Sequence, residues 1–338
     1  MVVRRGGSVS ADRRAGASRP QSQAAPRAKK VVLLAGGLGG ARLAPALRDR
    51  LPPGSLTVIA NVGDDLEWTG LRVSPDLDSI TYALAGLWHR ARGWGRKDET
   101  FRVRDMLAAL GASVWFGVGD RDLALHLARA ERLAAGRTLT EVTRELAGRL
   151  GVSGTDVLPA SDRLAPTRVR IRGGRVLAFQ EWYVRRGARP PVEEILHGRA
   201  PASAAALAAL AAADAVVLGP SNPLTSIGAV LALRGMRGAI RAVPRRVAIS
   251  PVVVRRGRQS AAIAHHAHAR RRALASIGLR DRPGSIAVLY RGLVQTFLLD
   301  ASDRVEARCV ARAGLEPVTA DLLDERALAR TLVRIGVG

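Results

Sequence analysis

The sequence predicts an α/β protein built on a doubly wound, mostly parallel, Rossmann-like sheet with an inserted β-hairpin and helical subdomain. Short apolar runs alternate with longer amphipathic segments along the 338-residue chain, and this alternation is typical of βαβ units. A glycine-rich turn, GGLGG at 36–40, follows the first apolar run directly. Two alternating runs around the Gly173-Gly174 pair interrupt the pattern within 167–187 and indicate the hairpin.

The elements follow from the spacing of apolar residues. In the first half we expect strands at 31–34, 56–62 and 113–119 and a helix at 41–51. Thr138 and Glu141 have the spacing of a capping box, so a further helix is expected to begin there. In the second half we expect helices near 202–213 and 320–336 and strands at 214–220, 245–254, 285–290 and 294–300.

Composition bounds the organisation of the chain. Residues 1–29 are rich in Arg, Ser, Ala, Gly and Pro and lack apolar periodicity, which predicts a disordered basic tail. Residues 30–338 then form a single α/β domain with an insertion around 135–200. No apolar run reaches membrane-spanning length, so we expect a cytoplasmic protein without a membrane partner. The single cysteine, Cys309, excludes an internal disulfide and a multi-cysteine metal site, and its expected place is a half-buried strand.

The formal net charge of +24 and the pI near 11.7 raise nucleic-acid binding as an alternative function. The arginines are scattered among Ala, Gly and Leu, and aromatic residues, which stack on bases, make up only 4% of the chain. A biased composition therefore explains the charge more simply, and we expect no specific nucleic-acid partner. A nonspecific basic surface stays open as an interpretation.

The turn after the first strand predicts a phosphate-binding loop, because glycines allow close approach and the following helix offers free amides. It does not complete a dinucleotide fingerprint, since Arg42 stands where the third glycine belongs, and it has no P-loop lysine. A turn without a ligand is the structural alternative. A second turn, GPSNP, precedes Ser226 and Thr225, whose hydroxyls suit a phosphate or a ribose. The predicted nucleotide-binding residues are Gly36, Gly37, Gly39, Gly40, Gly219, Ser221 and Asn222.

The stretch after the second strand, NVGDDLEWTGLRVSPDLDS, places Asp64, Asp65, Asp76 and Asp78 together. Carboxylates beside a phosphate loop suit Mg²⁺, which prefers oxygen ligands and shares them with substrate phosphates. Each aspartate alone is better explained by a turn or a helix cap, and Asp78 precedes a helical pattern for which it could be the N-cap. The clustering favours a metal or catalytic role for two of the four.

Two later loops carry charge. GWGRKDETF offers Arg96 and Lys97 to phosphate oxygens, although a solvated charge run is the alternative. GVGDRDL places Arg121 between Asp120 and Asp122 at the start of a helix, where capping by the aspartates and anion binding are equally consistent with the pattern. His265, His266 and His268 fit no zinc spacing and are expected at the surface.

Six stretches in order resemble the 2-phospho-L-lactate transferase family. They are AGGLGGARLA, NVGDDLEWTGLRVSPDLDS, GWGRKDETF, GVGDRDLALHL, FQEWYV and LGPSNPLTSIGAVLAL, within about 31–254. The resemblance implies transfer of a phospholactyl or phosphoenolpyruvyl group from a guanosine diphosphate ester to the deazaflavin Fo, with release of GMP, in coenzyme F-420 biosynthesis. It also implies a Mg²⁺ requirement and a homodimer.

The resemblance also implies roles for particular residues. Asp78 with Arg96 or Lys97 would contact Fo, and Asp64, Asp65 and Asp76 are the metal candidates. Asp78, Asp65 and Lys97 are the expected catalytic residues, Asp78 orienting or deprotonating the acceptor hydroxyl. The sequence departs from the family pattern at 255–275, a stretch expected near the nucleotide. The alternative function is a nucleotide- or nucleic-acid-binding protein without catalysis. A third hypothesis, a NAD-dependent dehydrogenase, is disfavoured by the incomplete glycine fingerprint.

Overall fold

The computed structural model describes residues 6–7, 28–253 and 260–338, so most of the expected tail at 1–29 lies outside the described residues. A seven-stranded sheet forms the centre, in the order β12-β11-β10-β9-β1-β2-β5, and every neighbouring pair is parallel. The predicted doubly wound sheet is therefore confirmed. Its strands are β1 (Val31–Ala35), β2 (Leu56–Ala60), β5 (Thr155–Pro159), β9 (Ala215–Leu218), β10 (Arg245–Ile249), β11 (Thr296–Asp300) and β12 (Glu316–Ala320).

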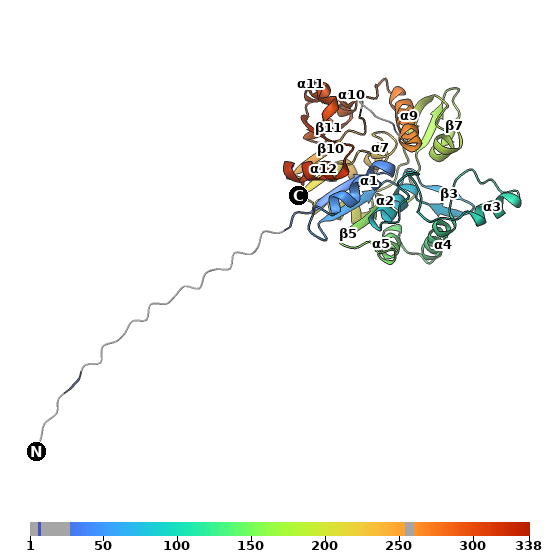
Figure 1. The fold of residues 1–338 in the computed structure, drawn as a ribbon, viewed down its shortest axis with the longest axis horizontal. Coiled ribbons are helices and arrows are strands. Elements are labelled where there is room, and N and C mark those ends of the chain that lie inside the picture. The colour runs from blue at the N-terminus through green and yellow to red at the C-terminus, as the bar shows by residue number, and fades with distance from the viewer. Residues whose placement is uncertain (1–5, 8–27, 254–259) are drawn as a thin grey trace, which may run out of the picture.

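Burial explains why the strands read as continuous apolar runs. Every residue of β1 is buried, and Leu33 lies in register between Val58 of β2 and Val217 of β9. Parallel strands are covered on both faces, so both side-chain directions enter a core. One layer contains α1 (Gly37–Arg48), α2 (Pro75–Leu84) and α12 (Glu325–Leu332), and the other contains α6 (Ala204–Ala211), α7 (Ile227–Ala232) and α8 (Met236–Ala242) (Figure 1).

The remaining helices are α3 (Arg102–Ala109), α4 (Asp120–Ala134), α5 (Leu139–Arg149), α9 (Ala261–Ala275), α10 (Pro283–Ala287) and α11 (Ala307–Arg312). Of these helices, α5, α10 and α11 add side chains to the core around the central sheet. The predicted capping box is confirmed at the start of α5, where the Thr138 hydroxyl accepts from the Glu141 amide and the Glu141 carboxylate accepts from the Thr138 amide. A short hairpin, β3 (Leu66–Trp68) and β4 (Leu71–Val73), separates the two aspartate pairs along the chain.

The inserted hairpin is confirmed as β6 (Arg168–Ile171) and β7 (Val176–Ala178), which are antiparallel, and β8 (Val192–Leu196) completes a small sheet. A short π-helix, η1 (Glu181–Arg185), follows β7 and packs beside α9 in Figure 1. This sheet spans 168–196, whereas 155–159, within the insertion expected at 135–200, forms an edge strand of the central sheet.

Two predicted strands are wrong. Residues 113–119 form no strand, and their apolar side chains, Phe116 and Val118, instead pack against the β3–β4 hairpin. Residues 285–290 are helical, in α10 and a following 3-10 turn, with Pro283 in the first helical turn. A short apolar run is compatible with a buried helix or a strand, and only tertiary packing decides between them. Cys309 is also misplaced by the prediction, since it is exposed on α11.

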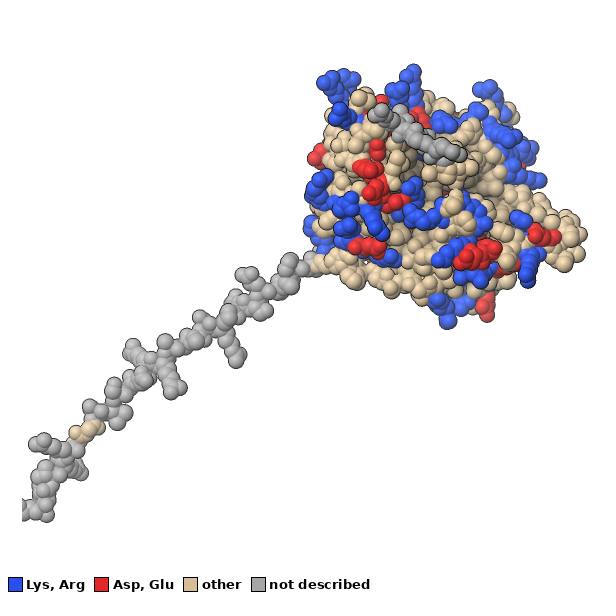
Figure 2. Space-filling view, in the orientation of Figure 1, with Lys and Arg blue, Asp and Glu red and all other residues tan. Residues whose placement is uncertain are grey.

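No helix among the described residues has the length and apolar character needed to cross a membrane. Lys and Arg side chains are spread over the face shown in Figure 2, with acidic side chains between them, rather than forming one basic stripe. The dispersed arginines of the sequence therefore remain dispersed on this face of the fold.

Candidate functional site

A cavity of about 370 Å³ opens at the carboxyl ends of the central strands. Residues that directly follow β1, β2, β9 and β10 line it, among them Gly37, Asp64, Ser221 and Ser250. The strand order reverses here, because β1 lies between β2 and β9 and the chain winds outward in both directions. Ligands of doubly wound folds bind at this switch point.

The two predicted turns pack against each other and build one wall. A Cβ atom on Gly39 would lie 2.1 Å from the carbonyl oxygen of Pro220, so only glycine allows this approach. The Ser221 hydroxyl accepts from the Gly36 amide at 3.0 Å and donates to the Gly36 carbonyl at 2.8 Å. These bonds hold the two turns together, and the Leu38 and Gly39 amides, which precede the first helical bond from Gly40 to Gly36, are the ones placed to hold a phosphate.

The predicted nucleotide-binding residues divide into two groups. Gly36, Gly37, Gly39, Ser221 and Asn222 line the cavity, as do Thr225 and Ser226. Gly40 instead permits close packing of α1 on β1, because a Cβ there would lie 2.5 Å from that of Ala35. Gly219 lies just outside the lining and donates its amide to Leu34.

Two of the four clustered aspartates face the cavity together. Asp64 and Asp76 both line it, and the Asn61 side-chain amide donates to one oxygen of each, at 2.8 and 2.9 Å. Burial and the neighbouring Asp76 hold the pKa of Asp64 well above its usual range, and burial raises the pKa of Asp76 to about 7. Two buried carboxylates with raised pKa values favour binding of a cation, which would offset their repulsion.

The other two aspartates point away from the cavity. Asp65 accepts from the Arg72 guanidinium, at 2.8 and 3.0 Å, and from the Ser74 hydroxyl at 2.9 Å. Burial still raises the pKa of Asp65 to about 6, with Arg72 opposing the shift. Asp78 forms a two-pronged ion pair with Arg129 of α4.

Asp78, Asp122 and His126 lie close enough for one cation to bind all three. Arg129 already supplies the positive charge beside Asp78, and the Tyr82 hydroxyl donates to Asp122 at 2.6 Å. This cluster is therefore accounted for as an internal ion pair network, and Asp64 with Asp76 is the better candidate for a metal.

The basic loop does not reach the cavity. Arg96 pairs with Trp88 in an isolated bridge, Lys97 is exposed, and neither lines the cavity. Glu99, from the same loop, accepts from the Arg121 and Asp122 amides, both at 2.9 Å, and thereby caps α4. The structure thus does not bring the three expected catalytic residues, Asp78, Asp65 and Lys97, together at the cavity.

The sequence reading missed three residues of the site. Asn61 directly follows β2, the position where function concentrates in this fold. Tyr183 of η1 and His266 of α9 also line the cavity and form a 2.9 Å hydrogen bond to each other. The expectation that His266 lies at the surface misses its setting, because α9 packs its histidines against η1 and the partly buried imidazole lines the cavity.

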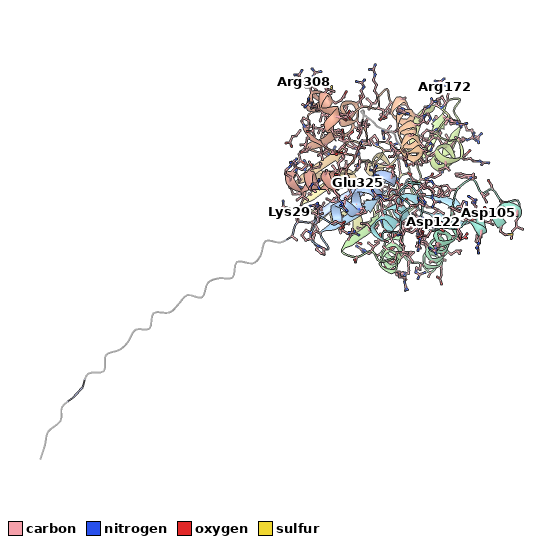
Figure 3. All side chains as sticks on the ribbon, in the orientation of Figure 1. Lys29, Asp105, Asp122, Arg172, Arg308 and Glu325 are labelled. Atoms are coloured by element: carbon pink, nitrogen blue, oxygen red, sulfur yellow. The ribbon has the colours of Figure 1, made fainter. Side chains whose placement is uncertain are left out.

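Two arginines also line the cavity, and each has a carboxylate partner. Arg42 of α1 contacts Glu325, which lies beside α1 in Figure 3, at 2.5 Å. Arg270 of α9 contacts Asp281 at 2.6 Å. Their charges are therefore largely balanced within the protein.

Comparison with known proteins gives consistent matches. The family model described as 2-phospho-L-lactate transferase CofD matches residues 31–335. The phosphoenolpyruvate transferase of Thermobifida fusca is 43% identical over 239 residues, covering 66% of this chain and 74% of that protein. That of Kitasatospora aureofaciens is 38% identical over 296 residues, covering 85% and 89%. A crystal structure of a UPF0052 family member from Bacillus halodurans shares the fold, with a TM-score of 0.57 at 18% identity over 90% of this chain and 99% of that chain.

Proposed function

We propose a specific reaction for this chain, which belongs to the 2-phospho-L-lactate transferase family and is therefore a transferase rather than a passive nucleotide- or nucleic-acid-binding protein. The proposed reaction moves a phosphoenolpyruvyl or phospholactyl group from a guanosine diphosphate ester to the deazaflavin Fo, with release of GMP. The names of the similar actinobacterial proteins favour the enolpyruvyl donor. The family further suggests a place in coenzyme F-420 biosynthesis, a homodimer and a cytoplasmic location.

One observation carries this proposal: the Asp64–Asn61–Asp76 arrangement lies directly beside the glycine turn in a single cavity. Donors of a guanosine diphosphate ester carry anionic phosphates, which match both the amides of the turn and a cation held by the carboxylates. The donor set fits Mg²⁺, because it is made of hard carboxylate oxygens and contains no thiolate or imidazole ligand. Bound Mg²⁺ would neutralise charge on the phosphates during transfer.

The chain's own residues act by holding the reactants. The oxygen of the Fo hydroxyl attacks the phosphorus that bears the enolpyruvyl or lactyl group, and the bond to the GMP oxygen breaks. Such transfer asks for alignment and charge stabilisation more than for covalent chemistry. Ser221 fixes the turn through Gly36, the Leu38 and Gly39 amides at the start of α1 would hold the phosphates, and Asn61 fixes the orientation of both carboxylates.

The proposal is tested by incubating the purified protein with Fo, Mg²⁺ and the guanosine diphosphate ester of enolpyruvate or of lactate. We expect mass spectrometry to detect the Fo phosphodiester and GMP in equal amounts, and Asp76→Asn to abolish both. Asp105→Asn is the matched control, because Asp105 is exposed on α3 at the outer end of the molecule in Figure 3. A folded wild-type protein that makes no product with either donor would contradict the proposed reaction.

A further inference from the structure

The wall formed by α9 and η1 adds a side chain that the reaction described above does not yet use. His266 Nδ1 lies 2.9 Å from the Tyr183 hydroxyl, and both residues line the cavity. The Tyr183 ring is itself fixed, because Phe179 stacks on it at 5.3 Å between ring centres and His265 lies 4.5 Å away. His266 therefore has a rigid hydrogen-bond partner on one side of its ring.

Two further bonds fix the helix that carries His266. His265 Nε2 donates to the carbonyl of Tyr183, and His268 Nε2 donates to the carbonyl of Ala188, both at 3.1 Å. These contacts hold α9 against η1 and against the turn that follows η1, on either side of His266. The direction of the His266 ring is consequently set by the packing of the two elements.

The His266 ring reaches the phosphate turn. The position that a Cβ atom would take on Gly37 lies 4.0 Å from His266 Cε1 and 3.2 Å from Asp76 Oδ1. The imidazole and a proposed metal ligand thus border the same space above Gly37, whose φ of +48° also favours glycine. This is the space in which the glycine turn would hold phosphate.

The protonation states of His266 and Tyr183 limit how the two side chains can share a hydrogen bond. Burial, with His265 and Arg270 nearby, lowers the pKa of His266 to about 4, so the imidazole is neutral at pH 7. Burial raises the pKa of Tyr183, so its phenol keeps its proton. A phenol that donates to Nδ1 leaves the hydrogen of the neutral ring on Nε2, whereas a phenol that accepts from Nδ1–H leaves Nε2 without hydrogen. Among the described residues, no acceptor is found for an Nε2–H.

We propose that the Tyr183 phenol donates to Nδ1 of His266, and that His266 is a substrate-binding residue whose Nε2–H donates a hydrogen bond to a phosphate oxygen of the guanosine diphosphate donor. A neutral imidazole can stabilise developing negative charge as a pure donor, without exchanging a proton. Tyr183 is then a positioning residue, because its hydroxyl selects the ring form that presents Nε2–H. This inference rests on the proposed function for the identity of the nucleotide.

The test uses calorimetric binding of GDP and of guanosine to the full chain, together with product formation. A hydrogen bond to a charged oxygen is worth about 10- to 100-fold in affinity. We expect His266→Ala to weaken GDP binding by about that factor and to leave guanosine binding unchanged. His266→Gln, whose amide N–H can replace Nε2–H, should recover most of the loss, and Tyr183→Phe should lose less than His266→Ala.

His268→Ala is the matched control, because it removes a contact between α9 and the turn after η1, and His268 does not line the cavity. GDP affinity near the wild-type value in folded His266→Ala, or an equal loss in His268→Ala, would overturn the proposal. A Gln variant as weak as Ala would overturn the donor role as well. The proposed function fails separately, if the wild-type protein binds GDP and makes no Fo product.

Discussion

Substitution of Gly39 by alanine tests whether the contact between the two turns shapes the nucleotide site. Gly39 lies in the first turn of α1, where the new Cβ would stand 2.1 Å from the Pro220 carbonyl oxygen. Contacts of this kind are not found below about 3.0 Å, so the turns must separate by about 1 Å. Neither partner is the end of a flexible side chain, so the movement has to be made by backbone.

The expected magnitudes differ for stability and for binding. Overpacking costs about 1–3 kcal/mol, whereas alanine in a helix gains up to about 1 kcal/mol over glycine. The net loss in the free energy of unfolding is therefore about 0–2 kcal/mol, and the protein should fold. A displacement of about 1 Å at the phosphate turn is large for a positioned reaction, and we expect the transfer rate to fall about 100-fold.

Gly238→Ala is the control, because Gly238 is exposed within α8 and nothing lies within 4 Å of its Cβ position. It should raise the free energy of unfolding by about 0.5–1 kcal/mol and leave transfer unchanged. Urea unfolding followed by circular dichroism and steady-state kinetics with varied donor measure both quantities. Wild-type kinetics in Gly39→Ala, or an equal loss in Gly238→Ala, would refute the argument.

Three further substitutions test the buried charges. Asp76→Asn should abolish Mg²⁺ binding in calorimetry and raise the melting temperature, since it removes a repelling carboxylate; retained binding would exclude Asp76 as a ligand. Arg129→Met leaves Asp78 buried without its partner, so the free energy of unfolding in urea should fall by about 3–5 kcal/mol. Adding Asp78→Leu should restore this loss. A smaller loss that is additive in the double variant would show that the two side chains are not coupled. Asp65 has a folded pKa of about 6 against an ordinary 3.8, so its contribution to stability is full below pH 4 and is lost as pH rises through 6. Relative to Asp65→Asn, the wild-type free energy of unfolding should therefore fall by about 3 kcal/mol between these values, and identical pH profiles would contradict this.

The sequence predicted where the site lies in the fold better than it predicted which residues line it. Buried parallel strands read as apolar runs, and the residues after β1, β2 and β9 do meet at one cavity. Which aspartate enters the cavity could not be read from spacing. Successive helical residues are turned by about 100°, so Asp76 and Asp78 face nearly opposite directions from the first turn of α2. One reaches Asn61 and the other reaches Arg129.

The prediction for the three histidines of α9 failed for a different reason. Their spacing excluded a zinc motif, and from this we expected all three side chains at the surface. Whether they are covered depends, however, on the element that packs against α9 rather than on α9 itself. The partner is η1, in the segment FQEWYV, which the alternating pattern assigned to a strand. A strand would have directed alternate side chains to opposite faces, so the meeting of Tyr183 with His266 was not foreseeable from periodicity.

The arginines that give the chain its large positive charge are not the groups proposed to hold phosphate. The two arginines that line the cavity are matched by Glu325 and Asp281. The groups proposed to contact the phosphates are neutral hydrogen-bond donors rather than arginines. They are the amides of the glycine turn, the hydroxyls near Ser221 and the imidazole of His266. Unbalanced arginines beside Asp64 and Asp76 would neutralise those carboxylates and oppose a cation there. Balanced arginines leave the cavity with carboxylates directly beside neutral donors, which is the arrangement that a cation and a diphosphate need in order to bind together.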